Sequence, residues 1–271
     1  MARILICLHE RDRRWRSNSL IFHMARIWKR RGHAVGAWRG AHGEPPPADV
    51  LIAHIDLTRI PEAYGALFER FPRVVNGGVS DISKRFVSDN LVGPSDAYAG
   101  RVIVKTDNNY GGIPEAFHAR HQLDLEDQPW ATRTHLKPSS YPVFDSIDDV
   151  PTDIWTNEAL VVEKYIAERV EGSWSTRIAF FCGSRHFSYR MFSPEYVLKG
   201  DTVTRIEPAE TPPDVIALRD RFKLDYGKLD YVIHDGRAIV FDVARTPGGV
   251  ADQQVNREFA AALADGIDDY L

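Results

Sequence analysis

The stretch that decides the fold runs from residue 228 to residue 248 and reads KLDYVIHDGRAIVFDVARTPG. Apolar residues on both sides flank the dipeptide Asp235-Gly236. Asp-Gly between two such runs is a strong local signal for a β-hairpin. Asp230 interrupts the first run and Asp242 the second, and both lie toward the open end of the hairpin. The stretch therefore predicts two paired strands that each carry one acid.

The length of the turn decides whether the two acids can act together. A two-residue loop at the Asp-Gly dipeptide pairs Asp242 with Leu229 and directs the two carboxylates to opposite faces, because side chains alternate along a strand. A three-residue loop that begins at His234 pairs Asp242 with Lys228 and brings it to the face of Asp230. Only the second register creates a joint metal site. Carboxylates on adjacent strands suit Mg²⁺, which prefers oxygen ligands and often binds together with nucleotide phosphates.

These residues resemble the metal-binding hairpin of the ATP-grasp superfamily. In that family, acids on two adjacent strands, followed by an Asn and a Pro-Gly turn, hold the magnesium ions of MgATP. Asp230 and Asp242 match the acids, and Thr246-Pro247-Gly248 matches the turn. Ala244 occupies the position of the expected Asn, and an alanine side chain cannot bind metal. The resemblance implies either that one magnesium site is lost or that another group replaces this ligand.

The resemblance extends upstream and covers the chain from about Asn76 to its end. The family has a lysine near the start of a helix that follows the first domain, and Lys84 matches it. A second family lysine ends a strand before a glycine-containing loop, and Lys105 with Gly111-Gly112 matches this arrangement. Triphosphate needs fixed cations and backbone N–H groups that approach closely. The resemblance therefore implies that these residues contact the nucleotide phosphates.

A third upstream segment resembles the strand against which ATP-grasp proteins bind adenine. Residues 161–166 read VVEKYI. In the family an acidic side chain and backbone groups of this strand bind the adenine edge, which assigns adenine to the stretch Glu163-Lys164-Tyr165-Ile166. A nearby acid binds the ribose. We assign this role to Glu171, with Glu168 as the alternative.

The remaining pattern predicts the fold class and the domains. Residues 1–78 alternate apolar strand segments with helical segments, and such alternation predicts a sheet covered by helices. We therefore expect an α/β protein that begins with a small Rossmann-like domain over residues 1–78. Residues 79–271 contain the ATP-grasp segments and several hairpins, so an α+β ATP-grasp domain is expected there.

The composition of the 271-residue chain narrows the classes of function. With 34 Lys and Arg against 38 Asp and Glu, the net charge of −4 argues against a nucleic-acid binder, which needs a basic surface. Two cysteines cannot build a disulfide framework or a multi-cysteine zinc site, which favours a cytoplasmic protein. The first apolar stretch is too short for a signal peptide or a membrane span, so we expect no membrane association.

The resemblance implies an ATP-dependent, ADP-forming ligase that joins a carboxylic acid to an amine or a thiol through an acyl phosphate. The acid would belong to a small molecule or a peptide. Three cations are candidates beside the transferring phosphoryl group: Lys228, Arg245 and Arg177. A phosphotransferase is the alternative enzyme, and Ala244 favours a non-catalytic nucleotide-binding protein as the other alternative. The chain is short for the superfamily, which suggests a homodimer or a partner protein.

Two further clusters are open to more than one interpretation. Four arginines follow the first predicted strand: Arg11, Arg13, Arg14 and Arg16. Open α/β sheets bind ligands at this edge, so the arginines could bind an anionic substrate or form a solvated basic loop. His118 and His121 lie three residues apart, but no third metal ligand is evident, and we expect them at the surface.

Overall fold

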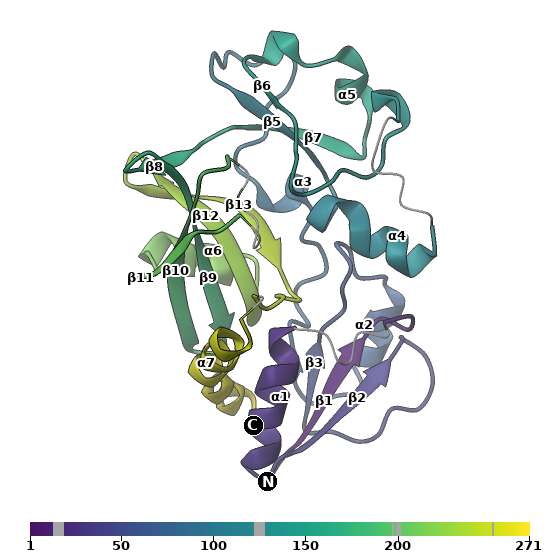
Figure 1. Cartoon of the computed structure of the whole chain (residues 1–271). Helices are drawn as coiled ribbons and strands as arrows, with labels where there is room; N and C mark the ends of the chain where they lie inside the picture. The colour runs from purple at the N-terminus through teal and green to yellow at the C-terminus, as the bar shows by residue number, and fades with distance from the viewer. Residues whose placement is uncertain (13–18, 122–127, 197, 199–201, 251) are drawn as a thin grey trace.

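A computed structural model describes residues 1–12, 19–121, 128–196, 198, 202–250 and 252–271, and its described residues form three β-sheets with surrounding helices (Figure 1). The N-terminal sheet has the strand order β2-β1-β3-β4. A large sheet has the order β11-β10-β9-β12-β13, with β8 beside β9, and a small sheet has the order β6-β5-β7. This mixture of helices and sheets agrees with the expected class, while the domain boundary at residue 78 stays a prediction.

The N-terminal sheet is parallel and consists of β1 (Arg3–Leu8), β2 (Ala34–Arg39), β3 (Val50–Ala53) and β4 (Val74–Val75). The helices beside it are α1 (Leu20–Arg30) and α2 (Ala63–Phe68). Ile4 and Ile6 of β1 pack in the same apolar cluster as α1, whereas Leu5 and Cys7 pack in the cluster that contains residues of α2. Both faces of the sheet are therefore covered, which explains the continuous apolar run of β1.

The small sheet is antiparallel and consists of β5 (Val102–Thr106), β6 (Val143–Phe144) and β7 (Leu160–Lys164). Short α-helices and 3₁₀ turns belong to the same part of the chain: α3 (Lys84–Val87), η1 (Asn109–Gly112), α4 (Ile113–Ala119), η2 (Trp130–Thr132), η3 (Ile147–Asp149) and α5 (Thr152–Thr156). Among the described helices, none combines the length and the apolar character that a membrane span requires.

The large sheet is antiparallel throughout its described pairings. Its strands are β8 (Glu168–Val170), β9 (Ser173–Cys182), β10 (Arg185–Ser193), β11 (Arg205–Ala209), β12 (Tyr226–His234) and β13 (Arg237–Ala244). Three helical segments accompany it: α6 (Pro213–Arg221), α7 (Gln253–Leu263) and η4 (Ala264–Tyr270).

The turn between β12 and β13 has two residues. His234 pairs with Arg237, which leaves Asp235 and Gly236 as the loop. The φ angles of these two residues, 49° and 75°, are both positive, as a type I′ turn requires. The three-residue loop considered from the sequence is therefore wrong, because the Asp-Gly dipeptide satisfies the tighter turn without help from a third residue.

A β-bulge in β13 then changes the register of the hairpin. Val240 pairs with Tyr231, but Asp242 pairs with Asp230, so Phe241 is an extra residue without a partner in the ladder. In a regular two-residue hairpin Asp242 would face away from Asp230, because one residue of shift exchanges the faces. The bulge restores the shared face. The two acids therefore face each other, although through a register that differs from both that were expected.

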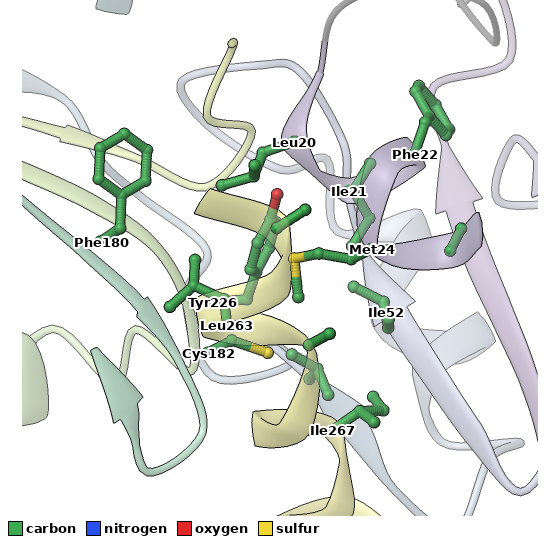
Figure 2. Packing of buried hydrophobic residues seen from close by; sticks show 14 of the residues in the cluster. Leu20, Ile21, Phe22, Met24, Ile52, Phe180, Cys182, Tyr226, Leu263 and Ile267 are labelled. Carbon is green, nitrogen blue, oxygen red and sulfur yellow. The ribbon is translucent and has the colours of Figure 1, made fainter. Parts of the chain in front are cut away.

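A single apolar cluster joins the N-terminal sheet to the large sheet (Figure 2). Leu20 and Met24 of α1 lie beside Leu263 of α7 and Ile267 of η4, and Phe180 of β9 belongs to the same cluster. All five side chains are almost completely buried. Because these residues come from α1, from the last helical segments and from β9, the burial of this apolar surface holds the two parts of the protein together.

Asn76 makes a polar connection between the same two sheets. It follows β4, is fully buried and has a φ of 62°, a conformation that Asn tolerates better than most residues. Its Nδ2 donates to the carbonyl oxygen of Tyr226 at 2.6 Å, and its Oδ1 accepts from the backbone N–H of Tyr226 at 3.0 Å. Its own backbone N–H donates to Asp225 Oδ2 at 2.7 Å.

We expect Asn76→Ala to lower the free energy of unfolding by about 2–5 kcal/mol, because it leaves two buried backbone groups of Tyr226 without partners and adds strain at a positive φ. Asn76→Gly removes the strain but not the lost hydrogen bonds, so it should recover only about 1 kcal/mol. Urea unfolding followed by circular dichroism measures both effects. A loss below about 0.5 kcal/mol in the Ala variant would show that this junction does not stabilise the fold.

Candidate functional site

A cavity lies between the small sheet and the large sheet, which face each other in the upper half of Figure 1. Its wall includes residues of β5 and β7 on one side and of β9, β10, β12 and β13 on the other. Apolar and aromatic walls with a few convergent charged groups are typical of ligand sites. Nine residues singled out from the sequence line this cavity: Lys84, Lys105, Glu163, Lys164, Tyr165, Ile166, Glu168, Asp230 and Asp242.

The two aspartates of the hairpin each pair with a lysine. Lys228 Nζ lies 2.7 and 2.6 Å from the two carboxylate oxygens of Asp230. Lys84, which begins α3, donates from Nζ to Oδ1 of Asp242 and also to Oδ1 of Asn109 at 3.0 Å. The Lys84–Asp242 pair therefore connects the segment before the small sheet to the last strand of the large sheet.

The two ammonium groups of these pairs keep their charge. Burial lowers the pKa of Lys84, but Asp242 and other carboxylates of the cavity raise this pKa more. Burial also lowers the pKa of Lys228, and Asp230 and Asp242 again outweigh the effect. Both pKa values therefore lie above the ordinary value for lysine. At neutral pH each aspartate faces a positive charge.

A third ion pair lies within the small sheet. Lys105 Nζ of β5 is 2.5 Å from Oε2 of Glu163 on β7, and both side chains are nearly inaccessible, at 9% and 1% exposure. The same Nζ lies 4.9 Å from the centre of the Phe241 ring. Oε1 of Glu163 is buried and has no hydrogen-bond partner among the described residues. A ligand N–H group that reaches this oxygen would satisfy a buried acceptor.

Aromatic side chains gather next to the end of β7. The ring of Tyr165 lies 6.0 Å from that of Trp174 and 6.3 Å from that of Tyr196, both in edge-to-face arrangements. All three line the cavity. Flat aromatic and apolar walls beside a buried carboxylate suit a planar, N–H-bearing ring. Of these three residues, only Tyr165 was expected from the sequence. Trp174 and Tyr196 come to the cavity because the large sheet folds over the end of β7.

The structure places the two ribose candidates differently. Glu168 lines the cavity and accepts from Arg177 Nη2 at 2.9 Å and from Arg190. Glu171 does not line it: this residue lies in the turn between β8 and β9, and its exposed carboxylate is 3.6 Å from Arg205. The geometry therefore favours Glu168, the alternative, over our first choice. The sequence pattern did not predict the strand β8. Without that strand, nothing in the sequence indicated that Glu168 faces the cavity.

The two glycines expected to cover phosphates are packed against another segment. A Cβ added to Gly111 would lie 2.0 Å from the carbonyl oxygen of Leu136, so only glycine fits there. A Cβ on Gly112 would come within 3.1 Å of the carbonyl oxygen of Thr134. Neither glycine lines the cavity, whereas the preceding residue, Tyr110, does. Close packing against residues 134–138 is the physical reason for these glycines in this structure.

None of the three expected catalytic cations lines the cavity itself. Arg245 is fully buried and donates to the carbonyl oxygens of Val79 at 2.7 Å, of Thr58 at 3.2 Å and of Leu57. Burial lowers the pKa of this guanidinium to about 10. These contacts favour a structural role for Arg245. Arg177 binds Glu168, as described above, which favours a positioning role, and Lys228 remains beside Asp230.

The remaining candidates contribute no metal site in the described part of the chain. His118 is buried on α4, and its ring is tilted against that of His9 at a centroid distance of 3.9 Å, so its expected exposure is wrong, while His121 is exposed. Among the described residues, no group of three or more His, Cys, Asp and Glu side chains is arranged so that it could hold a metal ion. Arg11 donates to the carbonyl oxygen of His118 at 2.5 Å. The other three loop arginines lie outside the described residues: Arg13, Arg14 and Arg16.

The donor set at the hairpin fits magnesium. Asp230 and Asp242 offer carboxylate oxygens from directly opposite positions, and each already holds a cation in the form of a lysine ammonium. Magnesium commonly takes one or two protein carboxylates and completes its shell with water and phosphate oxygens. Two protein carboxylates are therefore enough for an ion that binds together with a nucleotide.

Comparison with known structures identifies the fold. The chain aligns with the ATP-grasp ligase PsnB, solved with a minimal precursor, Mg and ADP, over 98% of this chain and 97% of that one, at 12% identity and a TM-score of 0.54. It aligns with a RimK domain ATP-grasp protein of Sphaerobacter thermophilus (98% and 98%, 12% identity, TM-score 0.50). It also aligns with the D-alanine–D-alanine ligase of Bacillus anthracis complexed with ATP (100% and 96%, 12% identity, TM-score 0.50).

These likenesses establish that the chain has the ATP-grasp fold, as the sequence motifs predicted. No protein-family model matches the chain, and no curated protein sequence matches it significantly. The fold is therefore shown by structure, at a sequence identity too low to carry an activity from one protein to another.

The buried pair in the small sheet allows a test that needs no ligand. We expect Lys105→Met to lower the free energy of unfolding by about 3–5 kcal/mol, because it leaves the carboxylate of Glu163 buried without its cation. The double variant Lys105→Met/Glu163→Gln should recover most of this loss. Lys164→Met is the matched control, since Lys164 lies over the Tyr98 ring and pairs with no carboxylate in the described structure. Equal losses in Lys105→Met and Lys164→Met would contradict the pair.

Proposed function

We propose that the protein is an ATP-dependent, ADP-forming ligase that joins a carboxylic acid to an amine or a thiol. The observation that carries this proposal is the cavity in which two opposed carboxylates, Asp230 and Asp242, lie with Lys84 and Lys105 between two antiparallel sheets. Acids that can hold magnesium and lysines that can bind phosphate are the groups that phosphoryl transfer needs. The structural neighbours named above are ligases or ATP-grasp proteins, which supports the same reaction class.

ATP would bind with its adenine at the end of β7 and its phosphates toward the hairpin. The unpartnered Oε1 of Glu163 would accept a hydrogen bond from the exocyclic amine of adenine, and Tyr165 and Trp174 would flank the ring. Glu168 would lie near the ribose. Lys105 would bind phosphate oxygens, for which it must leave Glu163.

Magnesium would bind at Asp230 and Asp242, where it would neutralise charge on the transferring phosphoryl group. The lysines that hold these carboxylates in the free protein, Lys228 and Lys84, would then turn toward the phosphates and the acyl group. Each carboxylate would then keep a cation as its partner, because magnesium would replace the lysine. Lys228 remains the cation that we propose beside the acyl phosphate.

The reaction would proceed in two steps. A carboxylate oxygen of the acid attacks the γ-phosphorus of ATP, the bond between this phosphorus and the β,γ-bridging oxygen breaks, and ADP leaves. The amine or thiol then attacks the acyl carbon of the acyl phosphate, loses its proton, and releases inorganic phosphate. The chain contributes mainly position and charge, which supply most of the catalysis in phosphoryl transfer.

The acid would enter from the N-terminal sheet. Thr246, two residues after the end of β13, donates to Asp56 Oδ1 at 2.8 Å, and the carbonyl oxygen of Pro247 accepts from the backbone N–H of Leu20 at 3.2 Å. The end of the metal hairpin thus meets the carboxyl edge of the N-terminal sheet, where open α/β sheets bind ligands. Arg11 follows β1 at this edge, and a guanidinium group suits a small-molecule or peptide carboxylate.

Location and partners are part of the same proposal. Cys7 and Cys182 are both free and buried, which agrees with a reducing cytoplasm. A homodimer or a complex with a partner protein is part of this proposal. Nucleic acid and membranes are not among the proposed partners.

The experiment is an assay of ADP release with MgATP against a panel of carboxylic acids, each with candidate amines and thiols. We expect release to require one acid and one nucleophile together. Asp242→Asn should lower the rate by about 10²-fold or more, because it removes a charge that stabilises the transition state. Lys137→Ala, an exposed lysine away from the cavity, is the control and should keep the wild-type rate.

The other outcomes identify the alternatives. A phosphorylated acid or alcohol that accumulates without a nucleophile would indicate a phosphotransferase. MgATP that raises the melting temperature without ADP release for any acid would indicate a nucleotide-binding protein without catalysis, since binding alone stabilises the folded state. Absence of both effects would reject the ATP site itself.

A further inference from the structure

Asn109 lies beside the hairpin of β12 and β13, although it follows a strand of the small sheet on the other side of the cavity. It begins η1, the 3₁₀ turn that follows β5, and its backbone N–H donates to Thr58 Oγ1 at 2.7 Å. Its side-chain Nδ2 donates to the carbonyl oxygen of Val243 at 2.9 Å. Val243 is the residue between Asp242 and Ala244, the position at which the family pattern leads us to expect an Asn. An amide is therefore present next to this position, supplied by a different segment.

The chemistry of its two partners determines which way the amide of Asn109 points. The carbonyl oxygen of Val243 can only accept a hydrogen bond, so the amide nitrogen must face it. The ammonium of Lys84 can only donate, so the amide oxygen must face Lys84. The orientation of this side chain thus follows from hydrogen bonding and not from an arbitrary choice between its two ends.

The ammonium of Lys84 marks a place where a cation is already bound. Its Nζ donates both to Oδ1 of Asp242 and, at 3.0 Å, to Oδ1 of Asn109. A carboxylate oxygen and a carboxamide oxygen therefore converge on one positive charge. Magnesium takes ligands of this kind at about 2.0–2.1 Å, so the amide oxygen would need to approach by only about 1 Å.

We propose that Asn109 supplies, from the turn after β5, the carboxamide ligand that Ala244 cannot supply. Asp242 then serves two magnesium ions, one shared with Asp230 and one shared with Asn109. This inference rests on the proposed function, because the second ion binds only with the nucleotide phosphates and after Lys84 has moved to them. The carboxamide ligand therefore comes from a different position than in the family pattern, while the expected number of magnesium ions is still two.

The test counts the manganese ions bound by the whole chain in the presence of a non-hydrolysable ATP analogue, with free Mn²⁺ measured by electron paramagnetic resonance. We expect about two ions per wild-type chain, as in sites that use a metal pair. Asn109→Ala should bind only one. The double variant Asn109→Ala/Ala244→Asn should bind two again, because it returns the amide to position 244. Asn108→Ala, which removes the neighbouring amide, should bind two.

Asn109→Asp separates the metal ligand from the structural role of the side chain. It keeps an oxygen toward the ion but loses the donor to Val243, so the proposal expects two ions in this variant and one in Asn109→Ala. Equal counts in these two variants would overturn the assignment. One ion in the wild-type chain would overturn it as well, while the ATP site would stand. Absence of nucleotide-dependent Mn²⁺ binding in the wild-type chain would instead overturn both the inference and the proposed function.

Discussion

Phe241 is an extra residue in β13. For this reason the side chain of Asp242 lies on the same face of the sheet as that of Asp230, and not on the opposite face. Both carboxylates reach the cavity only through this register. The same bulge brings the Phe241 ring into the cavity wall, 4.9 Å from the ammonium of Lys105. Bulges often redirect a side chain next to a functional site, and here one residue decides whether two acids can share a metal.

Three lysine–carboxylate pairs gather at the cavity of the free protein, and they range from half-buried to fully buried. Lys84 pairs with Asp242 and Lys228 pairs with Asp230. In the small sheet, the third lysine pairs with Glu163. Buried charges are costly unless they are paired, so this arrangement keeps the site folded when no ligand is bound. In our proposal, MgATP brings both cations for the acids and anions for the lysines. The nucleotide and the metal would therefore bind best together.

The resemblance of its motifs predicted the ATP-grasp fold, and local signals in the sequence predicted the elements. The Asp-Gly turn indicated the hairpin, and the apolar runs indicated strands on both sides of the cavity. The bulge could not be predicted, because nothing in the residues next to Phe241 requires an extra one. The buried role of Arg245 and the approach of Asn109 to β13 were missed for a different reason. Both depend on contacts between segments more than 100 residues apart, as the separations of 188 and 134 positions show.

The most direct measurement of the central claim is a crystal structure of the protein with magnesium and a non-hydrolysable ATP analogue. We expect the triphosphate between Lys84 and Lys105, metal bound to Asp230 and Asp242, and the lysines released from their carboxylates. A nucleotide bound elsewhere would contradict it. So would a nucleotide bound in the cavity while both aspartates keep their lysine partners and hold no metal.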